Sequence, residues 1–358
     1  MQTKLADFIK DTSEGREADA ILRKCVHCGF CTATCPTYQL LGDELDGLRG
    51  RIYLIKGMLE GFEVTARTQL HLDRCLTCRA CETTCPSGVQ YGRLVDIGRK
   101  LVEERVPRPL AQRLLRWMLS LVFPRRRLFA PLLKLGRWMR PVLPFSLQGK
   151  IPATVAAPGV WPDARHKRRM LALAGCVQPA LAPDINAACA RVLDKLGISL
   201  IEAAGAGCCG AVRYHLNAQE DGLDDMRRLI DAWWPYVEAE HGNTTEGVEA
   251  IVMTASGCGT TVKEYRHLLA HDPAYAAKAE RISSLTKDIS EVIAAESARL
   301  KQLLADTKAS TQASKLALQL PCSLQHGQRI AGLIESILGA AGFELTPVAD
   351  SHLCCGSA

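Results

Sequence analysis

The 358-residue chain lacks the features of a membrane-spanning or exported protein. No apolar run approaches the roughly twenty uncharged residues that a bilayer-spanning helix needs. The first residues hold no apolar segment followed by a small-residue cleavage site, so we expect no secretion signal. These absences predict a cytoplasmic protein.

Acidic residues are missing from one long stretch. From Arg105 to Pro162 there are eleven Lys or Arg and no Asp or Glu, whereas the net charge of the whole chain is only +6. Leu and Trp are interleaved with the arginines, and six prolines are expected to break the stretch into short helices: Pro107, Pro109, Pro124, Pro131, Pro141 and Pro144.

This basic apolar stretch has two interpretations. A basic amphipathic segment is typical of one that binds an anionic membrane surface or an acidic partner, and we expect such docking through residues 105–150. The plainer interpretation is a connector whose apolar side packs on the rest of the chain. Nucleic acid is not an expected partner, because no recognisable nucleic-acid-binding module accompanies the charge.

Cysteine, by contrast, is abundant. In a reducing compartment the sixteen cysteines are unlikely to be paired as disulfides, which favours metal ligation. Eight of them form two copies of the pattern C-x2-C-x2-C-x3-C-P, "CVHCGFCTATCP" and "CLTCRACETTCP".

This spacing predicts two [4Fe–4S] clusters. Three thiolates two residues apart can wrap one cubane, while the fourth, held in extended backbone by the following proline, points elsewhere. In two-cluster ferredoxins the fourth cysteine ligates the other cluster. We therefore expect crossed ligation, with one cluster on Cys25, Cys28, Cys31 and Cys85 and the other on Cys75, Cys78, Cys81 and Cys35.

Zinc sites and a disulfide knot are the alternatives for these eight cysteines. Zinc sites favour separated C-x2-C pairs over four cysteines in one run. His27 lies inside the first motif, and we expect it to be exposed or to bond a sulfur rather than to be a ligand.

The cluster motifs are flanked by predicted helices. Apolar residues recur at helical spacing over 48–59 and again over 93–106, after the second motif. The first region is therefore expected to be all-helical.

Beyond residue 165 the pattern is that of an α/β protein. Predicted strands end near Cys176 and Cys258, and a predicted helix and strand lead from the first of these to the pair Cys208 and Cys209. The end of the chain repeats the plan, because Cys322 precedes Cys354 by 32 residues, as Cys176 precedes Cys208. The second copy is incomplete, since the residues that lead to Cys258 in the first have no counterpart after Cys355.

The repeat shows which feature of the first copy matters. "GAGCCG" matches a dinucleotide-binding pattern, but the second copy reads "SHLCCG" and keeps only the cysteine pair. We therefore expect no flavin or nicotinamide on this chain.

Strand-end cysteines gather at one edge of a parallel sheet. Cys176, Cys208, Cys209 and Cys258 are thus candidate ligands of one site, with Cys322, Cys354 and Cys355 as its partial copy. A redox-active thiol set and a zinc site are alternatives to an iron–sulfur centre there. Cys189 falls on the apolar face of a predicted helix, and we expect it to be a core residue.

Two such ferredoxin motifs followed by two C-x31-C-C-G modules resemble the CCG-domain family of electron-transfer subunits. Within it, "DELDGLRGRIYLIKGMLEG", "CCGAVRYHLNAQ", "TASGCGTTVKEY" and "PCSLQHGQ" are most similar to glycolate oxidase iron–sulfur subunits. One departure is that the first module offers Cys258 alone where heterodisulfide reductase-like modules have C-x2-C. This puts the noncubane cluster of that subfamily in question.

The resemblance implies a function. An FAD-containing partner would oxidise a 2-hydroxy acid, and this chain, which is not expected to be catalytic alone, would pass electrons toward a membrane quinone. The chain would then be peripheral at the inner face of the cytoplasmic membrane. A thiol–disulfide enzyme subunit, a lactate or glycerol-3-phosphate dehydrogenase subunit and a cluster-bearing sensor are the alternatives.

The expected fold class is α plus α/β. We expect four regions: a helical ferredoxin domain at 1–104, a basic docking segment at 105–165, a first CCG module with a trailing helix at 166–312 and a partial second module at 313–358.

Overall fold

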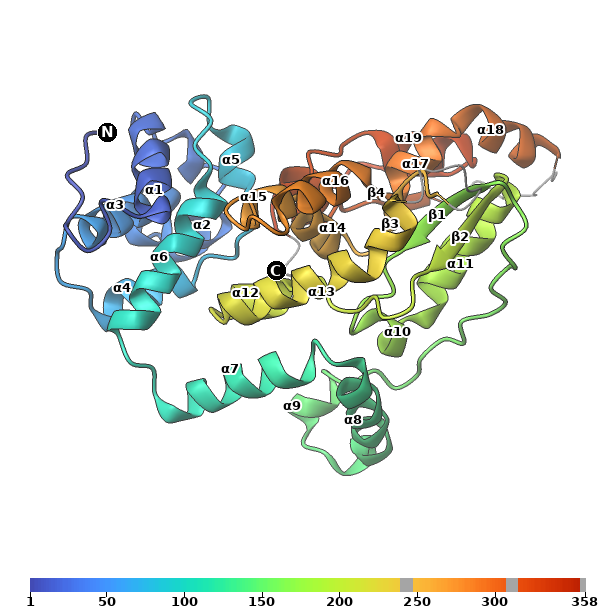
Figure 1. Ribbon diagram of the computed structural model, residues 1–358, viewed down its shortest axis with the longest axis horizontal. Helices are drawn as coiled ribbons and strands as arrows, with labels where there is room; N and C mark the ends of the chain where they lie inside the picture. The colour runs from blue at the N-terminus through green and yellow to red at the C-terminus, as the bar shows by residue number, and fades with distance from the viewer. Residues whose placement is uncertain (239–246, 307–314, 355–358) are drawn as a thin grey trace. The chain divides into compact units, whose positions relative to one another are not determined.

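The computed structural model describes residues 1–238, 247–306 and 315–354 (Figure 1). The chain divides into two compact units. The first comprises Met1–Gln112, Leu316–Ala331 and Leu345–Ala358, and the second comprises Arg113–Lys315 and Gly332–Glu344. The four regions expected from the sequence stay a prediction.

Met1–Gln112, which is described throughout, contains helices and no strand, as expected. Its α-helices are α1 (Ser13–Lys24), α2 (Pro36–Leu41), α3 (Leu48–Leu59), α4 (Ala66–Asp73), α5 (Ala80–Thr84) and α6 (Tyr91–Arg105), with 3₁₀ turns η1 (Phe30–Thr32) and η2 (Glu44–Asp46). The helices predicted at 48–59 and 93–106 are confirmed as α3 and α6. One core joins the faces of α1, α3 and α6, with Leu22, Ile52, Ile55, Leu94 and Val95 fully buried.

Helix boundaries place the motif cysteines. Cys25 is the C-cap of α1, and Cys85 is the C-cap of α5. Cys35 is the N-cap of α2, which starts at Pro36 because proline suits the first helical turn. Helices of a packed core therefore fix cysteines of both motifs.

The basic stretch forms α7 (Leu110–Val122), α8 (Arg126–Met139), η3 (Arg140–Val142) and α9 (Phe145–Gln148). The expectation that every proline breaks a helix is wrong for Pro131, which lies inside α8. The carbonyl that loses its amide donor belongs to Arg127, an exposed residue whose oxygen water can satisfy.

The second unit is built on a parallel sheet of order β2-β1-β3-β4. The strands are β1 (Arg168–Ala172), β2 (Ile198–Glu202), β3 (Ile251–Met253) and β4 (Thr286–Asp288), and β1 pairs with both β2 and β3. The chain runs from β1 to β2 on one side and then crosses to β3 on the other side of β1. A topological switch point therefore lies between β1 and β3. Open α/β sheets bind ligands beyond the carboxyl ends of strands at such a point.

Helices cover both faces of this sheet. Met170 and Ala172 pack with the α11 residue Leu193 on one face, whereas Leu171 packs with the α13 residue Trp233 on the other, as the two-residue period of a strand requires. The helices are α10 (Gln178–Leu181), α11 (Pro183–Lys195), α12 (Ala211–His215), α13 (Gln219–Glu238), α14 (Ser256–Lys263), α15 (Tyr265–Leu268), α16 (Ala276–Leu285), α17 (Ile289–Ala295) and α18 (Ser297–Asp306).

The first-module elements were largely predictable. The strands expected near 168–176, 198–203 and 248–258 are confirmed as β1, β2 and β3, and Cys189 is a buried residue of α11, as expected. The fourth strand was not predicted, because Thr286–Asp288 is short and two of its three residues are charged.

The last part of the chain contains β5 (Lys315–Ala317), the π-helical turn η5 (Ser323–Gly327), α19 (Leu333–Ala340) and β6 (Glu344–Thr346). β5 and β6 form a separate two-stranded sheet. The strand–helix–strand order matches the expected second copy, while the duplication itself stays a prediction. Within the described ranges, no helix is long and apolar enough to cross a membrane.

Candidate iron–sulfur sites

The first unit holds two small cavities, each lined by four cysteines. One is lined by Cys25, Cys28, Cys31 and Cys85. The other is lined by Cys35, Cys75, Cys78 and Cys81. Each cavity thus takes three cysteines from one motif and the last cysteine of the other, which is the grouping that crossed ligation predicts.

The two cysteine loops follow the same backbone path. His27 and Gly29 in the first loop have φ values of 55° and 82°, and Thr77 and Arg79, at the equivalent positions of the second, have 54° and 59°. Left-handed residues next to right-handed ones turn successive amides toward one point, a geometry found at many iron–sulfur sites. Arg79 adopts this conformation without being glycine, at a cost of about 1–3 kcal/mol that a loop shaped for a bound group can offset.

The electrostatics of the cysteines also fit a metal. Burial, together with the thiols of Cys25, Cys28 and Cys85, raises the pKa of Cys31 to about 11. Burial and the nearby Cys75 and Cys78 likewise raise the pKa of Cys81. Four thiolates in one cavity repel one another, and a bound metal centre removes that repulsion because its cations are the local counter-charge.

Each cavity also presents a buried polar group without a protein partner. Both ring nitrogens of His27 lack a hydrogen-bond partner among the described residues, and the ring stacks on Tyr53 at 4.8 Å. The hydroxyl of Tyr91, a residue only 3% exposed, is also unpaired within the described part of the chain. Both residues line their cavities, so each can donate a hydrogen bond to a sulfur there. The residues present therefore fit a cluster at both sites.

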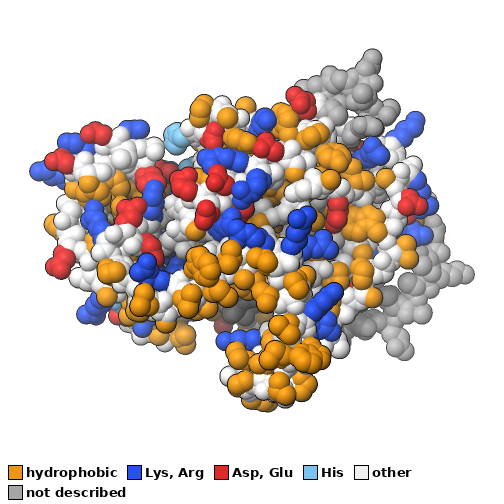
Figure 2. All heavy atoms as spheres, turned by 60° about the horizontal axis from the view of Figure 1, so that its bottom comes forward, with side chains coloured by type: hydrophobic (Ala, Val, Ile, Leu, Met, Phe, Trp, Pro, Cys, Tyr) orange, Lys and Arg blue, Asp and Glu red, His pale blue; other side chains and the backbone are white. Residues whose placement is uncertain are grey.

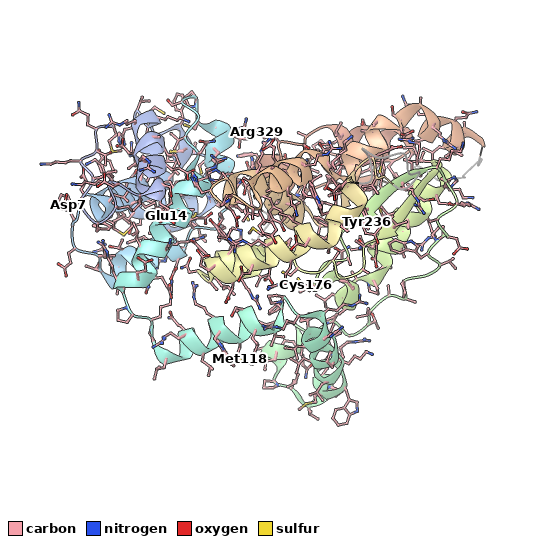
Figure 3. The ribbon with its side chains drawn as sticks, viewed as in Figure 1. Asp7, Glu14, Met118, Cys176, Tyr236 and Arg329 are labelled. Carbon is pink, nitrogen blue, oxygen red and sulfur yellow. The ribbon has the colours of Figure 1, made fainter. Side chains whose placement is uncertain are left out.

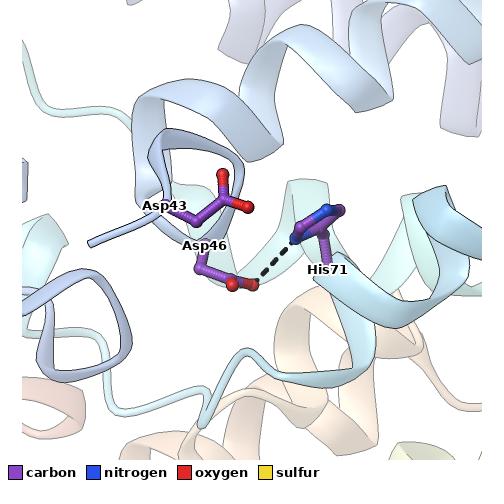
Figure 4. A group of neighbouring side chains, drawn as sticks. All are labelled: Asp43, Asp46 and His71. Carbon is purple, nitrogen blue, oxygen red and sulfur yellow. Dashed lines mark hydrogen bonds and ion pairs between the residues drawn. The ribbon is translucent and has the colours of Figure 1, made fainter. Parts of the chain in front are cut away.

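A buried charge network includes Arg51, which lines the second cavity. Figure 4 shows three neighbouring side chains of this region, Asp43, Asp46 and His71. Asp46, Asp43 and His71 are close enough to suggest a metal site. However, Asp46 is fully buried and already pairs with Arg51 at 3.5 Å and Arg74 at 2.8 Å, and His71 Nδ1 lies 3.0 Å from its carboxylate. The two guanidinium groups already supply the positive charge that a metal cation would bring to the Asp46 carboxylate. We therefore interpret this cluster as an ion-pair network.

In the second unit the structure brings four expected cysteines together. Cys176 follows β1, Cys208 and Cys209 follow β2, and Cys258 lies in the first turn of α14 after β3; Cys176 is labelled in Figure 3. Their thiols form a chain of contacts in which Cys208 contacts both Cys176 and Cys209, and Cys209 contacts Cys258.

These thiols are unequal. Hydrogen bonds from Cys176 and Cys209, helped by the Gly210 amide at 3.4 Å, lower the pKa of Cys208 to about 3. The contact with Cys208, followed by burial, raises the pKa of Cys176. A cavity of about 520 Å³ lined by Arg213, Asp225 and Cys208 lies beside this thiolate. The four sulfurs form a donor set suited to a soft metal.

The cysteines of the partial copy are placed differently. Cys322 lies within the first unit, where its thiol contacts both Cys78 and Cys354. The hydrogen bond from Cys322 lowers the pKa of Cys78 to about 6. Nearby, His326 Nδ1 lies 2.7 Å from the Thr83 hydroxyl, and His326 Nε2 donates a 2.9 Å hydrogen bond to the His352 carbonyl. Cys355 lies outside the described residues.

Sequence reasoning missed Tyr91, Asp46, Arg51 and His326. Arg51 could have been found, because it occupies a position on the apolar face of the predicted helix at 48–59, where a charged residue needs an explanation. Asp46 and His326 lie in the stretches "DELDGLRGRIYLIKGMLEG" and "PCSLQHGQ" that carry the resemblance, but nothing in their spacing assigns them a role. Tyr91 lies in no pattern that marks it.

Comparisons with known proteins bear on these sites directly. Residues 21–89 match the 4Fe–4S dicluster domain, and residues 170–263 match the cysteine-rich CCG domain. The glycolate oxidase iron–sulfur subunit of Escherichia coli (strain K12) is 56% identical over 358 residues, which is all of this chain and 84% of that protein. The chain belongs to the glycolate oxidase iron–sulfur subunit family.

More distant relatives carry related names. The probable glycolate oxidase iron–sulfur subunit of Bacillus subtilis (strain 168) is 28% identical over 98% of this chain and 82% of its own length. Lactate utilization protein A of Bacillus licheniformis is 26% identical over 51% of this chain and 69% of its own length. No solved structure gives a significant match.

Crossed ligation predicts which cysteine replacements act alike in this family member. Cys28→Ala and Cys85→Ala should remove the same cluster, and Cys78→Ala and Cys35→Ala should remove the other, each lowering bound iron by about four atoms per chain. Electron paramagnetic resonance of the reduced variants identifies which signal disappears. Loss of the same signal in Cys28→Ala and Cys35→Ala would show ligation within each motif instead.

Proposed function

We propose that this chain is the electron-transfer subunit of a complex that oxidises glycolate on an FAD-containing partner and delivers the electrons to a membrane quinone. The observation that carries the proposal is the pair of cavities in the first unit, each lined by three cysteines of one motif and one of the other. The name of the Escherichia coli relative supports glycolate as the substrate of the complex.

The chain's own residues supply binding and orientation. Cys25, Cys28, Cys31 and Cys85 would hold one cluster, and Cys35, Cys75, Cys78 and Cys81 the other. When bound, such clusters supply one-electron chemistry. The His27 ring and the Tyr91 hydroxyl are positioned to donate to sulfur, and such hydrogen bonds tune the potential.

This division of labour predicts that glycolate alone does not reduce the chain. Adding the purified FAD-containing partner under anaerobic conditions should reduce the clusters at least a hundredfold faster than glycolate without it, as followed by bleaching of the visible absorbance. Cys85→Ala serves as a control with a damaged electron path. Rapid bleaching by glycolate with no partner present would contradict the proposal.

We also propose that Cys176, Cys208, Cys209 and Cys258 hold a further iron–sulfur centre. Their convergence at the carboxyl ends of β1, β2 and β3 supports it, as does the chain of contacts among their sulfurs. Sequence and geometry leave zinc as the competing occupant.

Metal analysis separates these occupants. A variant in which all eight ferredoxin cysteines are alanine should retain iron and acid-labile sulfide, and Cys208→Ser in that background should lose at least half of both. If the second unit instead carries about one zinc per chain and no sulfide, the further iron–sulfur centre is wrong.

A membrane surface is the proposed binding partner of α7 and α8. Leu110, Leu114, Trp117 and Met118 follow helical spacing on α7, and all are exposed, as Figure 2 shows for the apolar side chains of this region and Figure 3 for Met118. On α8 the exposed Leu128, Leu132, Leu135 and Met139 form a similar stripe. Arginines flank both stripes and no acidic side chain interrupts them, so the charge complements an anionic lipid surface.

Neutralising part of this charge should weaken lipid binding. Each basic residue near an anionic surface contributes about 1 kcal/mol, so replacing Arg125, Arg126 and Arg127 by Gln should lower the partition coefficient roughly a hundredfold or more. Co-sedimentation with vesicles that contain phosphatidylglycerol measures this. The control replaces the exposed Lys195, Lys287 and Lys301 of the second unit by Gln and should bind nearly as the parent does. Equal binding of all three proteins would exclude membrane docking through this segment.

A further inference from the structure

Arg51 is a buried charge beside the second cavity. Arg51 lies on α3 and is 1% exposed. Its Nη1 lies 4.0 Å from the Sγ of Cys35. Its Nε donates to the His71 carbonyl at 2.8 Å, and its Nη2 donates to the Thr37 hydroxyl at 3.1 Å. These neutral acceptors fix the guanidinium against the cavity without cancelling its charge.

The nearby carboxylate does not neutralise this site. Asp46 lies 3.5 Å from Arg51, but it also accepts a 2.8 Å hydrogen bond from Arg74. One carboxylate therefore faces two guanidinium groups. Arg51 stays charged, because an arginine guanidinium does not lose its proton in proteins.

Further charges bear on the same cavity. Arg99 donates to the Cys75 carbonyl at 2.6 Å and to the Leu72 carbonyl at 3.0 Å, which adds a second cation held by neutral acceptors. Glu82 follows the ligand Cys81 and contributes a negative charge, and its carboxylate accepts from the Gly92 amide. Arg79 also lines this cavity, so Arg51, Arg79 and Arg99 count against Asp46 and Glu82, and a positive surplus remains even without Arg74, whose side chain is 40% exposed.

The first cavity has a weaker counterpart of Arg51. Arg49 lines it, but its side chain is 38% exposed and pairs at 2.6 Å with Glu44, whose side chain is 43% exposed. The Met1 ammonium, also at the surface, donates to the Cys25 carbonyl at 3.1 Å. Water screens exposed charges, whereas a buried charge acts through a lower dielectric. The two cavities therefore differ mainly in a buried cation.

We propose that the buried guanidinium of Arg51 raises the reduction potential of the second cluster, on Cys35, Cys75, Cys78 and Cys81, above that of the first. An added electron increases the negative charge of a cluster, and a fixed cation nearby stabilises that charge. An electron supplied by the partner's reduced flavin would then reside preferentially on the second cluster rather than the first. The transfer moves one electron and makes or breaks no bond.

Arg51 thus acts by placing a positive charge beside the second cluster. The property that tests this role is the reduction potential of that cluster. The proposal rests on the two clusters of the proposed function, but the measurement uses dithionite and redox mediators, so it does not depend on glycolate or on the partner. In a titration followed by electron paramagnetic resonance, the second cluster of the parent protein should be reduced first. The cysteine variants described above identify the two signals.

Replacing Arg51 should shift the reduction potential of the second cluster in a predictable direction. In Arg51→Gln, the reduced-to-oxidised ratio of the second cluster at a fixed potential should fall at least tenfold, which corresponds to about 59 mV for one electron. Asp46→Asn removes the opposing charge and should shift the same ratio upward. Arg51→Lys should stay near the parent, and Arg49→Gln, the matched control on the same helix, should leave the second cluster unchanged.

Several outcomes would overturn the proposal. It fails if the second cluster of the parent titrates below the first, or if loaded Arg51→Gln shows no shift. It also fails if Arg49→Gln moves the second cluster as much as Arg51→Gln does. Should Arg51→Gln lose its second cluster, the upward shift in Asp46→Asn decides the matter, and its absence refutes the role of Arg51.

Discussion

Mutual repulsion among closely grouped thiolates is the constraint on which the first unit depends. Each cavity gathers four cysteines, and the pKa values of Cys31 and Cys81 rise because burial and neighbouring sulfurs disfavour the charged form. Helices of one core hold these cysteines in place, since Cys25, Cys35 and Cys85 are helix caps. The packing of the helical core thus brings together thiolates whose mutual repulsion a bound metal centre would remove.

The second unit solves a related problem with a sheet instead of a helical core. The parallel strands end at one edge of the sheet, and the segments that follow three of them bring their cysteines to the same place. The Cys208 sulfur contacts the Cys176 and Cys209 thiols and accepts a 3.4 Å hydrogen bond from the Gly210 amide, and these contacts lower its pKa. Both units therefore place cysteines at strand or helix ends, where the chain turns and several thiols can meet at one site.

Much of this could be predicted because spacing encodes it. The C-x2-C-x2-C-x3-C-P motifs predicted both cysteine groups lining the cavities, and the apolar period over 48–59 predicted α3. Strand-end positions predicted that Cys176, Cys208, Cys209 and Cys258 converge. Local patterns suffice in these cases because each motif or strand end fixes its own cysteines, and the repeated motif or the parallel sheet then determines which of them meet.

What could not be predicted depends on tertiary contacts. The network of Asp46, His71 and Arg74 joins residues up to 28 positions apart, and no local pattern pairs them. The contact of Cys322 with Cys78 likewise links distant segments of the first unit. Pro131 was misjudged because its lost hydrogen bond falls on the exposed Arg127 carbonyl, which only the fold reveals.

The most direct measurement of the central claim is the iron and acid-labile sulfide content of the anaerobically purified chain, together with Mössbauer spectroscopy. The account predicts at least eight iron and eight sulfide per chain in [4Fe–4S] form, as two clusters require. Stoichiometric zinc at the ferredoxin cysteines, or iron without sulfide, would contradict it.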